Sequence, residues 1–121
     1  MSDPVSDEFL ELRQLVRSFV AERDWEQFHT PKNLAVSLCV EAAELLEPFQ
    51  WLVTGDDAEL TASKRKQVRL EMADVLIYLV RLADKLQIDL PSAVREKISL
   101  NKAKYPVEKV RGDARKYDEY E

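Results

Sequence analysis

The chain has 121 residues, of which 45% are hydrophobic and 34% are charged, and its formal net charge is −5. This composition suits a single folded domain and excludes collagen-like and low-complexity chains, while the acidic balance argues against binding to nucleic acid polymers. Two glycines are too few for a glycine-rich phosphate loop or for the frequent turns of an all-β protein, so we expect an all-α fold.

The cysteine and histidine counts limit the metal chemistry of the chain. One cysteine allows no internal disulfide and no thiolate zinc site, and one histidine excludes the two-histidine metal motifs. Any bound metal is therefore expected to have oxygen ligands. No stretch approaches the roughly 18 apolar residues of a membrane span, and the N-terminus lacks an apolar leader. The sequence predicts a soluble, cytoplasmic protein that does not bind membranes.

The first helix is expected from about Ser6 to about Arg23. Acidic residues at its start suit the positive end of the helix dipole, and apolar residues then recur on one helical face. These residues are Phe9, Leu12, Leu15, Val16, Phe19 and Val20. A short connection over residues 24–29 leads to the next helix.

The second helix is expected to begin at Thr30 and Pro31, a capping hydroxyl followed by a proline at the first helical position. Pro48 removes a helical hydrogen bond and should kink or end the last turn. The apolar stripe consists of Leu34, Leu38, Ala42, Leu45 and Phe49. Residues 53–60, which include Gly55, are expected to form a loop.

The third helix, over residues 61–87, is the longest, and its apolar residues are spaced by four and three positions. They are Val68, Met72, Val75, Leu79, Leu82 and Leu86. Such a seam predicts packing against another helix. This helix would span ~40 Å, whereas a compact domain of this size has a radius of gyration of ~14 Å. We therefore expect a homo-oligomer, a dimer or a tetramer.

A fourth helix is expected to be capped near 89–91 and to end at about Tyr105, before Pro106. The residues after it, 106–121, form a polar tail with several basic side chains. With no internal repeat and no composition break, residues 1–121 are expected to form one domain, a subunit resembling a four-helix bundle.

Two acidic pairs have no evident structural role. Glu41 and Glu44 lie in the middle of the second helix, and Glu71 and Asp74 lie in the middle of the third. Neither pair has a Lys or Arg three or four residues away to offset the repulsion between the carboxylates. Both pairs border the apolar seams, where unpaired charge is costly.

Two explanations fit these pairs. A hard divalent cation such as Mg²⁺ would neutralise the carboxylates and could share its remaining positions with substrate phosphates. Alternatively, Arg or Lys from another helix or subunit would neutralise them. The residues alone leave both explanations open.

The spacing of the two acidic pairs, Glu41-x-x-Glu44 and Glu71-x-x-Asp74, resembles the signature of the all-α nucleoside triphosphate pyrophosphatases of the MazG-like superfamily. The resemblance extends over most of the chain. Within the superfamily, the chain is most similar to the branch that acts on dCTP. The stretches that carry it are ERDWEQFHTPKNL, FQW, EMADVLIYLVRLADKLQIDLP, KYP and RGDARKY.

The resemblance implies hydrolysis of a nucleoside triphosphate between its α and β phosphates, giving the monophosphate and pyrophosphate. It implies that Glu41, Glu44, Glu71 and Asp74 are the catalytic residues and bind Mg²⁺. The substrate implied is dCTP or a modified cytosine deoxynucleotide, and the role is cleaning of the nucleotide pool.

The resemblance also implies a set of substrate-binding residues, in which aromatic faces stack on the base and polar groups read its edge. The set consists of Trp25, Glu26, Gln27, Phe28, His29, Trp51, Asp74, Tyr78 and Asn101, with Lys102, Arg111 and Lys116 as candidate phosphate-binding cations. Trp25 and Trp51 flank the Glu41/Glu44 helix in the sequence. Both could equally be ordinary packing residues.

Two alternatives to a dCTP pyrophosphatase remain at this point. One is a pyrophosphatase for another nucleotide, such as dUTP or phosphoribosyl-ATP, because Val16 stands where dCTP-specific relatives carry a histidine. The other is a non-enzymatic helical oligomerisation module whose acidic residues are structural.

Overall fold

A computed structural model describes residues 7–116, 118 and 119, and every regular element in that part of the chain is helical. The elements are α1 (Asp7–Glu22), the 3-10 helix η1 (Glu26–Phe28), α2 (Pro31–Leu46), the 3-10 helix η2 (Glu47–Phe49), α3 (Ala62–Leu86), α4 (Leu90–Lys104) and α5 (Val107–Val110). The predicted all-α fold is confirmed. None of the helices in these ranges has the length and apolar composition needed to cross a membrane.

The starts of α2, α3 and α4 follow from local side-chain chemistry. The side chains of Thr30, Thr61 and Asp89 each accept a hydrogen bond of 3.1 Å from the backbone N–H three residues later. Each therefore satisfies one of the donors that a helix start leaves unpaired. The four main helices lie where the sequence predicts them.

Two short helices were not predicted from the sequence. η1 forms within the connection between α1 and α2, and α5 forms within the polar tail. The effect of Pro48 was predicted correctly: α2 ends at Leu46, and Pro48 lies in η2.

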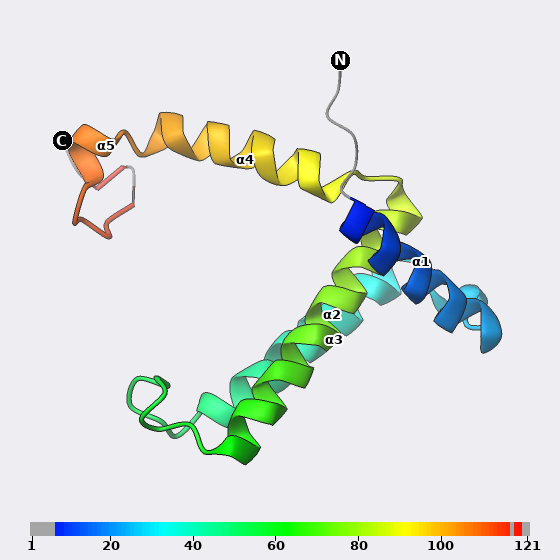
Figure 1. Cartoon of the computed structure of the whole chain (residues 1–121). Helices are drawn as coiled ribbons and strands as arrows, with labels where there is room; N and C mark the ends of the chain where they lie inside the picture. Colours follow the sequence, from blue (N-terminus) through cyan, green and yellow to red (C-terminus); the bar gives the residue numbers. More distant parts are fainter. Residues whose placement is uncertain (1–6, 117, 120–121) are drawn as a thin grey trace.

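The α2 and α3 helices run antiparallel along each other, and α1 packs across the C-terminal half of α3 (Figure 1). The core lies where these three helices meet. Leu34 and Val80 are each 1% exposed, and Val20 and Ala83 are also buried. One charged side chain, Arg81, is buried in this region.

By contrast, α4 extends away from the α2 and α3 pair and packs extensively on no other element of the described chain (Figure 1). It contains no buried residue, and Val94 and Ile98 are both about half exposed. The apolar seam of α3 is also partly open, since Met72 is 57% exposed. Exposed apolar surface on this scale is typical of protein interfaces.

Candidate active site

Three carboxylates come together between α2 and α3. Glu41 and Glu44 point from α2 and Glu71 points from α3, and one carboxylate oxygen of each lies within 4.8 Å of the others. We call these three residues the carboxylate cluster. The spacing of three residues within α2 puts both of its glutamates on the face that α3 covers.

The carboxylate cluster has no internal charge compensation. Glu41 Oε2 and Glu71 Oε2 are both buried and lack a hydrogen-bond partner among the described residues. Partial burial, and then the nearby carboxylates of Glu44, Asp74 and Glu71, raise the pKa of Glu41 from 4.5 to about 7. Burial and the charge of Glu44 also raise the pKa of Glu71.

The donor set fits a hard divalent cation. All the converging atoms are carboxylate oxygens, and two of them are buried without a partner, which is costly unless a cation binds there. No ion pair between described residues involves Glu41, Glu44 or Glu71. Of the two explanations left open by the sequence, neutralisation by Arg or Lys of the same chain is not observed in this part of the structure.

A cavity of about 510 Å³ lies beside the carboxylate cluster, between α1, α3 and the residues around the start of α2. Its wall is mostly apolar, with a few polar side chains. The lining residues are Leu12, Leu15, Val16, Phe19, Val20, Trp25, His29, Glu41, Ala73, Asp74, Leu76, Ile77, Tyr78 and Arg81. Glu41 belongs to both the cavity and the carboxylate cluster, so the two are continuous.

Four of the predicted substrate-binding residues line this cavity: Trp25, His29, Asp74 and Tyr78. The Trp25 ring contacts Phe19 of α1 edge-on, with ring centroids 5.6 Å apart, which orients the indole. Asp74 lies beside Glu41 in the cavity wall and outside the group of three clustered acids. The structure thus brings together predicted residues from the connection between α1 and α2 and from α3.

Three other predicted residues, all in η1, have different surroundings. The carboxylate of Glu26 forms ion pairs with Arg81 and Lys85. The side-chain amide of Gln27 donates to the backbone carbonyl of Asp24 at 3.0 Å. Phe28 is 60% exposed. Within this chain, none of these three side chains lines the cavity.

The remaining predicted residues lie away from the cavity of their own chain. Trp51 follows η2, at the opposite end of α2 from Trp25, and is 86% exposed. Asn101 and Lys102 are exposed near the outer end of α4, and Arg111 and Lys116 are exposed beyond it. Figure 1 shows how far this end of the molecule lies from the α2 and α3 pair.

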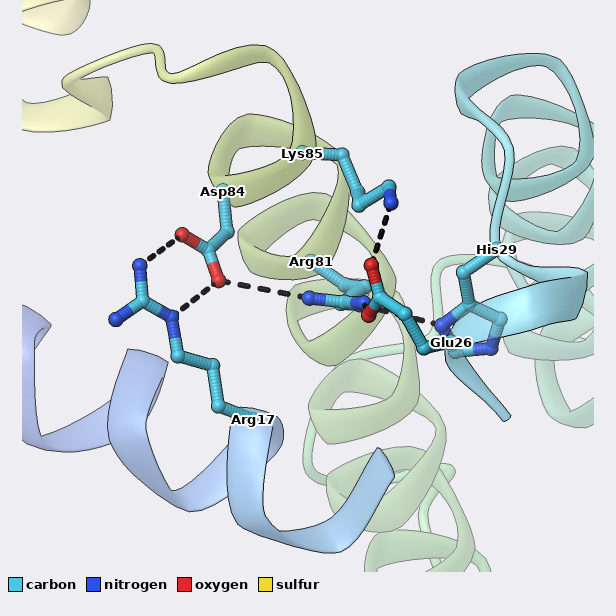
Figure 2. A network of polar contacts seen from close by, with 6 residues as sticks. All are labelled: Arg17, Glu26, His29, Arg81, Asp84 and Lys85. Atoms are coloured by element: carbon cyan, nitrogen blue, oxygen red, sulfur yellow. Dashed lines mark hydrogen bonds and ion pairs between the residues drawn. The ribbon is translucent and has the colours of Figure 1, made fainter. Parts of the chain in front are cut away.

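A polar network that was not predicted from the sequence adjoins the cavity through His29 and Arg81, and Figure 2 shows its side chains. Arg81 is 5% exposed, donates to the Nδ1 atom of His29 at 3.2 Å, and also pairs with Glu26 and Asp84. We call this set of connected side chains the Arg81 network. Its members are Arg17, Glu26, His29, Arg81, Asp84 and Lys85.

The acids of the Arg81 network are fully paired. Arg17 binds both oxygens of Asp84, at 2.6 and 2.5 Å, and lowers the pKa of that carboxyl. The hydrogen bond from Lys85, at 2.6 Å, and the charge of Arg81 lower the pKa of Glu26. A signal for Arg81 does exist in the sequence, because Asp74, Tyr78 and Arg81 are spaced by four and three residues and share one face of α3.

A model of the MazG-like family matches residues 36–120. The chain belongs to the MazG-like family. Human (Homo sapiens) dCTP pyrophosphatase 1 is 46% identical over 111 residues, which are 90% of this chain and 65% of that protein. The Bos taurus dCTP pyrophosphatase 1 is 46% identical over 109 residues, which are 88% of this chain and 64% of that protein. The chain therefore spans slightly less than two thirds of the length of these relatives.

One solved structure is similar to this chain, and the match covers nearly the whole of that structure. The crystal structure of a pyrophosphatase from Archaeoglobus fulgidus DSM 4304 matches with a TM-score of 0.77 and 42% sequence identity. The match covers 88% of this chain and 99% of that one. The resemblance to the MazG-like family that the sequence motifs indicate is thus confirmed.

Proposed function

We propose that the protein is a Mg²⁺-dependent nucleoside triphosphate pyrophosphohydrolase that converts dCTP, or a modified cytosine deoxynucleotide, to the monophosphate and pyrophosphate. The observation that carries this proposal is the continuity of the cavity and the carboxylate cluster through Glu41. The 46% identity to dCTP pyrophosphatase 1 supports the choice of substrate. Hydrolysis of free deoxynucleotides would suit a cytoplasmic role in cleaning the nucleotide pool.

In this proposal Glu41, Glu44, Glu71 and Asp74 hold Mg²⁺. When bound, the cation compensates the charge of the triphosphate and stabilises the charge that develops in the transition state. The buried, unpaired oxygens of Glu41 and Glu71 support this assignment, because a cation would satisfy both. The all-oxygen donor set favours Mg²⁺ over softer metals.

The cavity would bind the nucleoside. Trp25 offers an aromatic face for base stacking, and Tyr78 and His29 offer polar groups along the same wall. A nucleoside bound there would direct its phosphates toward Glu41 and the carboxylate cluster. In the reaction a water oxygen bonds to one phosphorus of the α,β-phosphoanhydride, and the bond from that phosphorus to the bridging oxygen breaks. The water gives up a proton to a carboxylate or to solvent, and the products are the monophosphate and pyrophosphate.

A second copy of the chain would complete the site. Trp51 is far along α2 from the cavity of its own chain and is 86% exposed, which suits a role in a neighbouring subunit. The exposed cations Lys102, Arg111 and Lys116 would reach a neighbour's phosphates in the same way. The open apolar faces of α3 and α4 support a dimer or a tetramer. Light scattering that gives a 14.0 kDa particle would contradict this assembly.

The test of the proposed function is release of pyrophosphate across a nucleotide panel, with and without Mg²⁺. The panel includes dCTP, 5-substituted dCTP, dUTP, dATP, dGTP and phosphoribosyl-ATP. We expect Mg²⁺-dependent turnover that is fastest for cytosine deoxynucleotides. Preference for dUTP or phosphoribosyl-ATP would reassign the substrate, and no turnover of any triphosphate would favour a non-enzymatic oligomerisation module.

A further inference from the structure

The hydrogen bond between Arg81 and His29 determines how the imidazole can act in the cavity. His29 is the one histidine of the chain and lines the cavity. Its Nδ1 faces the Nε atom of Arg81 at 3.2 Å. A guanidinium has only donor groups, so Nδ1 must accept and cannot carry a proton.

Arg81 is held in the orientation that makes this hydrogen bond. Its side chain is 6% exposed, and its terminal nitrogens pair with Glu26 on one side and Asp84 on the other. Figure 2 shows the guanidinium lying between these two carboxylates, with its Nε directed toward the imidazole. A planar group fixed at both ends has little freedom to release His29.

The other charged groups around His29 also favour the neutral ring. Burial, and then the positive charge of Arg81, lower the pKa of His29, and Lys85 acts in the same direction. The carboxylate of Glu26 opposes them, but both of its oxygens already pair with Arg81 and Lys85. A neutral imidazole with an accepting Nδ1 carries its proton on Nε2. No hydrogen bond between residues of the described chain involves Nε2, so its proton is available to a ligand in the cavity.

We propose that Arg81 is a positioning residue that holds His29 as the neutral tautomer with its proton on Nε2, and that the cavity thereby selects a base that presents a hydrogen-bond acceptor to His29. This inference rests on the proposed function, because it takes the cavity to be the nucleoside site. Cytosine offers two such acceptors, O2 and N3. A base edge that presents only donors there would leave the Nε2 proton unpaired in a confined site.

The tautomer is measurable directly, because a chain with one histidine gives one set of imidazole signals. In a ¹⁵N-labelled sample, two-bond ¹H–¹⁵N correlation spectra at neutral pH distinguish protonated from unprotonated ring nitrogens. We expect a protonated Nε2 and an unprotonated Nδ1 in the metal-free wild-type protein. A protonated Nδ1, or two protonated nitrogens, would overturn the proposal without any variant being needed.

Two variants separate positioning from a general structural role. Arg81→Met removes the donor to Nδ1, while Glu26 keeps Lys85 and Asp84 keeps Arg17 as partners. Arg17→Gln breaks the same network from its outer side, leaves the bond between Arg81 and His29 in place, and changes a side chain that does not line the cavity. Arg17→Gln is therefore the matched control.

We expect Arg81→Met to mix the two neutral tautomers, to raise the titration midpoint of His29, and to lower kcat/KM for dCTP about fivefold to tenfold through KM. Arg17→Gln should keep the wild-type imidazole spectrum and the wild-type kcat/KM. If both variants lose the same activity with the same spectrum, the role of Arg81 is structural and the proposal fails.

The two proposals fail in different ways. A wild-type protein that hydrolyses no triphosphate removes the proposed function, whatever the imidazole spectrum shows. An active protein with a protonated Nδ1 removes the role of Arg81 and leaves the pyrophosphohydrolase intact. Addition of dCMP should shift the Nε2 signal of the wild-type protein, and an unshifted signal would contradict contact between the base and His29.

Discussion

Two groups of carboxylates lie near the cavity and have opposite surroundings. The Arg81 network meets the cavity through Arg81 and His29, and the carboxylate cluster meets it through Glu41. At one end, Glu26 and Asp84 of the Arg81 network bind arginine and lysine, and their pKa values are lowered. At the other end, Glu41 and Glu71 of the carboxylate cluster have no ion-pair partner among the described residues, and their pKa values are raised. In both regions the carboxylates belong to Glu and Asp residues in helices. The residue type therefore does not account for the opposite directions of the pKa shifts.

The acids of the Arg81 network stabilise the fold, whereas those of the carboxylate cluster weaken it when no cation is bound. Paired carboxylates in the Arg81 network hold α1, η1 and α3 together. Unpaired carboxylates in the cluster repel each other and lose hydration, which costs free energy unless a cation binds. The absence of ion-pair partners for Glu41 and Glu71 within the described chain, beside the paired acids of the Arg81 network, is the reason we propose that an external cation binds at the carboxylate cluster.

The largest expected effect is on turnover in Glu71→Gln, which keeps the shape of the side chain and removes one charge. If Glu71 binds Mg²⁺, pyrophosphate release should fall by at least about 100-fold, because the cation carries the positioning and charge compensation of the reaction. Steady-state assays over a range of Mg²⁺ concentrations measure this. A variant with full activity would remove Glu71 from the metal site.

The two acidic regions should respond in opposite ways to loss of a carboxylate charge. Asp84→Asn breaks the pairs with Arg17 and Arg81 and should lower the free energy of unfolding by about 2–4 kcal/mol. Glu71→Gln relieves repulsion, so without metal its stability should equal or exceed that of the wild type. Urea unfolding in EDTA measures both variants. A strongly destabilised Glu71→Gln would mean that Glu71 has a structural cationic partner.

Trp51→Ala tests whether the exposed tryptophan binds a base. Nucleotide binding should weaken by ~1–3 kcal/mol, the usual contribution of a base-aromatic stack, with little change in the Mg²⁺ affinity of the free protein. Because Trp51 is far from the cavity of its own chain, the loss should appear only in the assembled oligomer. Calorimetric titration with a nonhydrolysable dCTP analogue measures it, and unchanged affinity would leave Trp51 as a packing residue.

The smallest effect is the pH dependence of stability in the metal-free protein. The pKa of Glu41 is raised from 4.5 to about 7 on folding, so the native state binds more protons than the unfolded state within that window. The free energy of unfolding should therefore fall as the pH rises from 4.5 to about 7. The lowered pKa values of Glu26 and Asp84 act at lower pH and in the opposite direction.

Thermal melts in EDTA across this pH range, on the wild type and on Glu41→Gln, isolate the contribution of Glu41. The substitution should flatten the slope, and Mg²⁺ should restore stability at the alkaline end by binding the ionised carboxylates. A wild-type slope of the opposite sign would show that the cluster is compensated in solution.

Much of this arrangement was predictable because it depends on local chemistry. The caps at Thr30, Thr61 and Asp89 act within four residues, so the helix starts follow from short stretches of sequence. The acidic pairs were identified for a local reason as well, the absence of a cation one turn away. The structure then brings Glu41 and Glu71 together across thirty positions of sequence.

The Arg81 network was not predicted because its partners are distant in sequence. Arg81 binds Glu26 and His29 over separations of 55 and 52 residues, and Arg17 binds Asp84 over 67. An arginine in an amphipathic helix such as α3 resembles an ordinary exposed charge until those partners are placed. The open position of α4 was likewise unpredicted, since helical periodicity indicates an apolar face but not what covers it.

Calorimetric titration of the metal-free protein with Mg²⁺ tests the central claim most directly. The wild type and Asp84→Asn should both bind the ion, because the second variant changes only the paired region, whereas Glu71→Gln should lose most of the affinity. Equal binding by Glu71→Gln and the wild type, or loss of binding in Asp84→Asn alone, would contradict the account by moving the cation away from the carboxylate cluster.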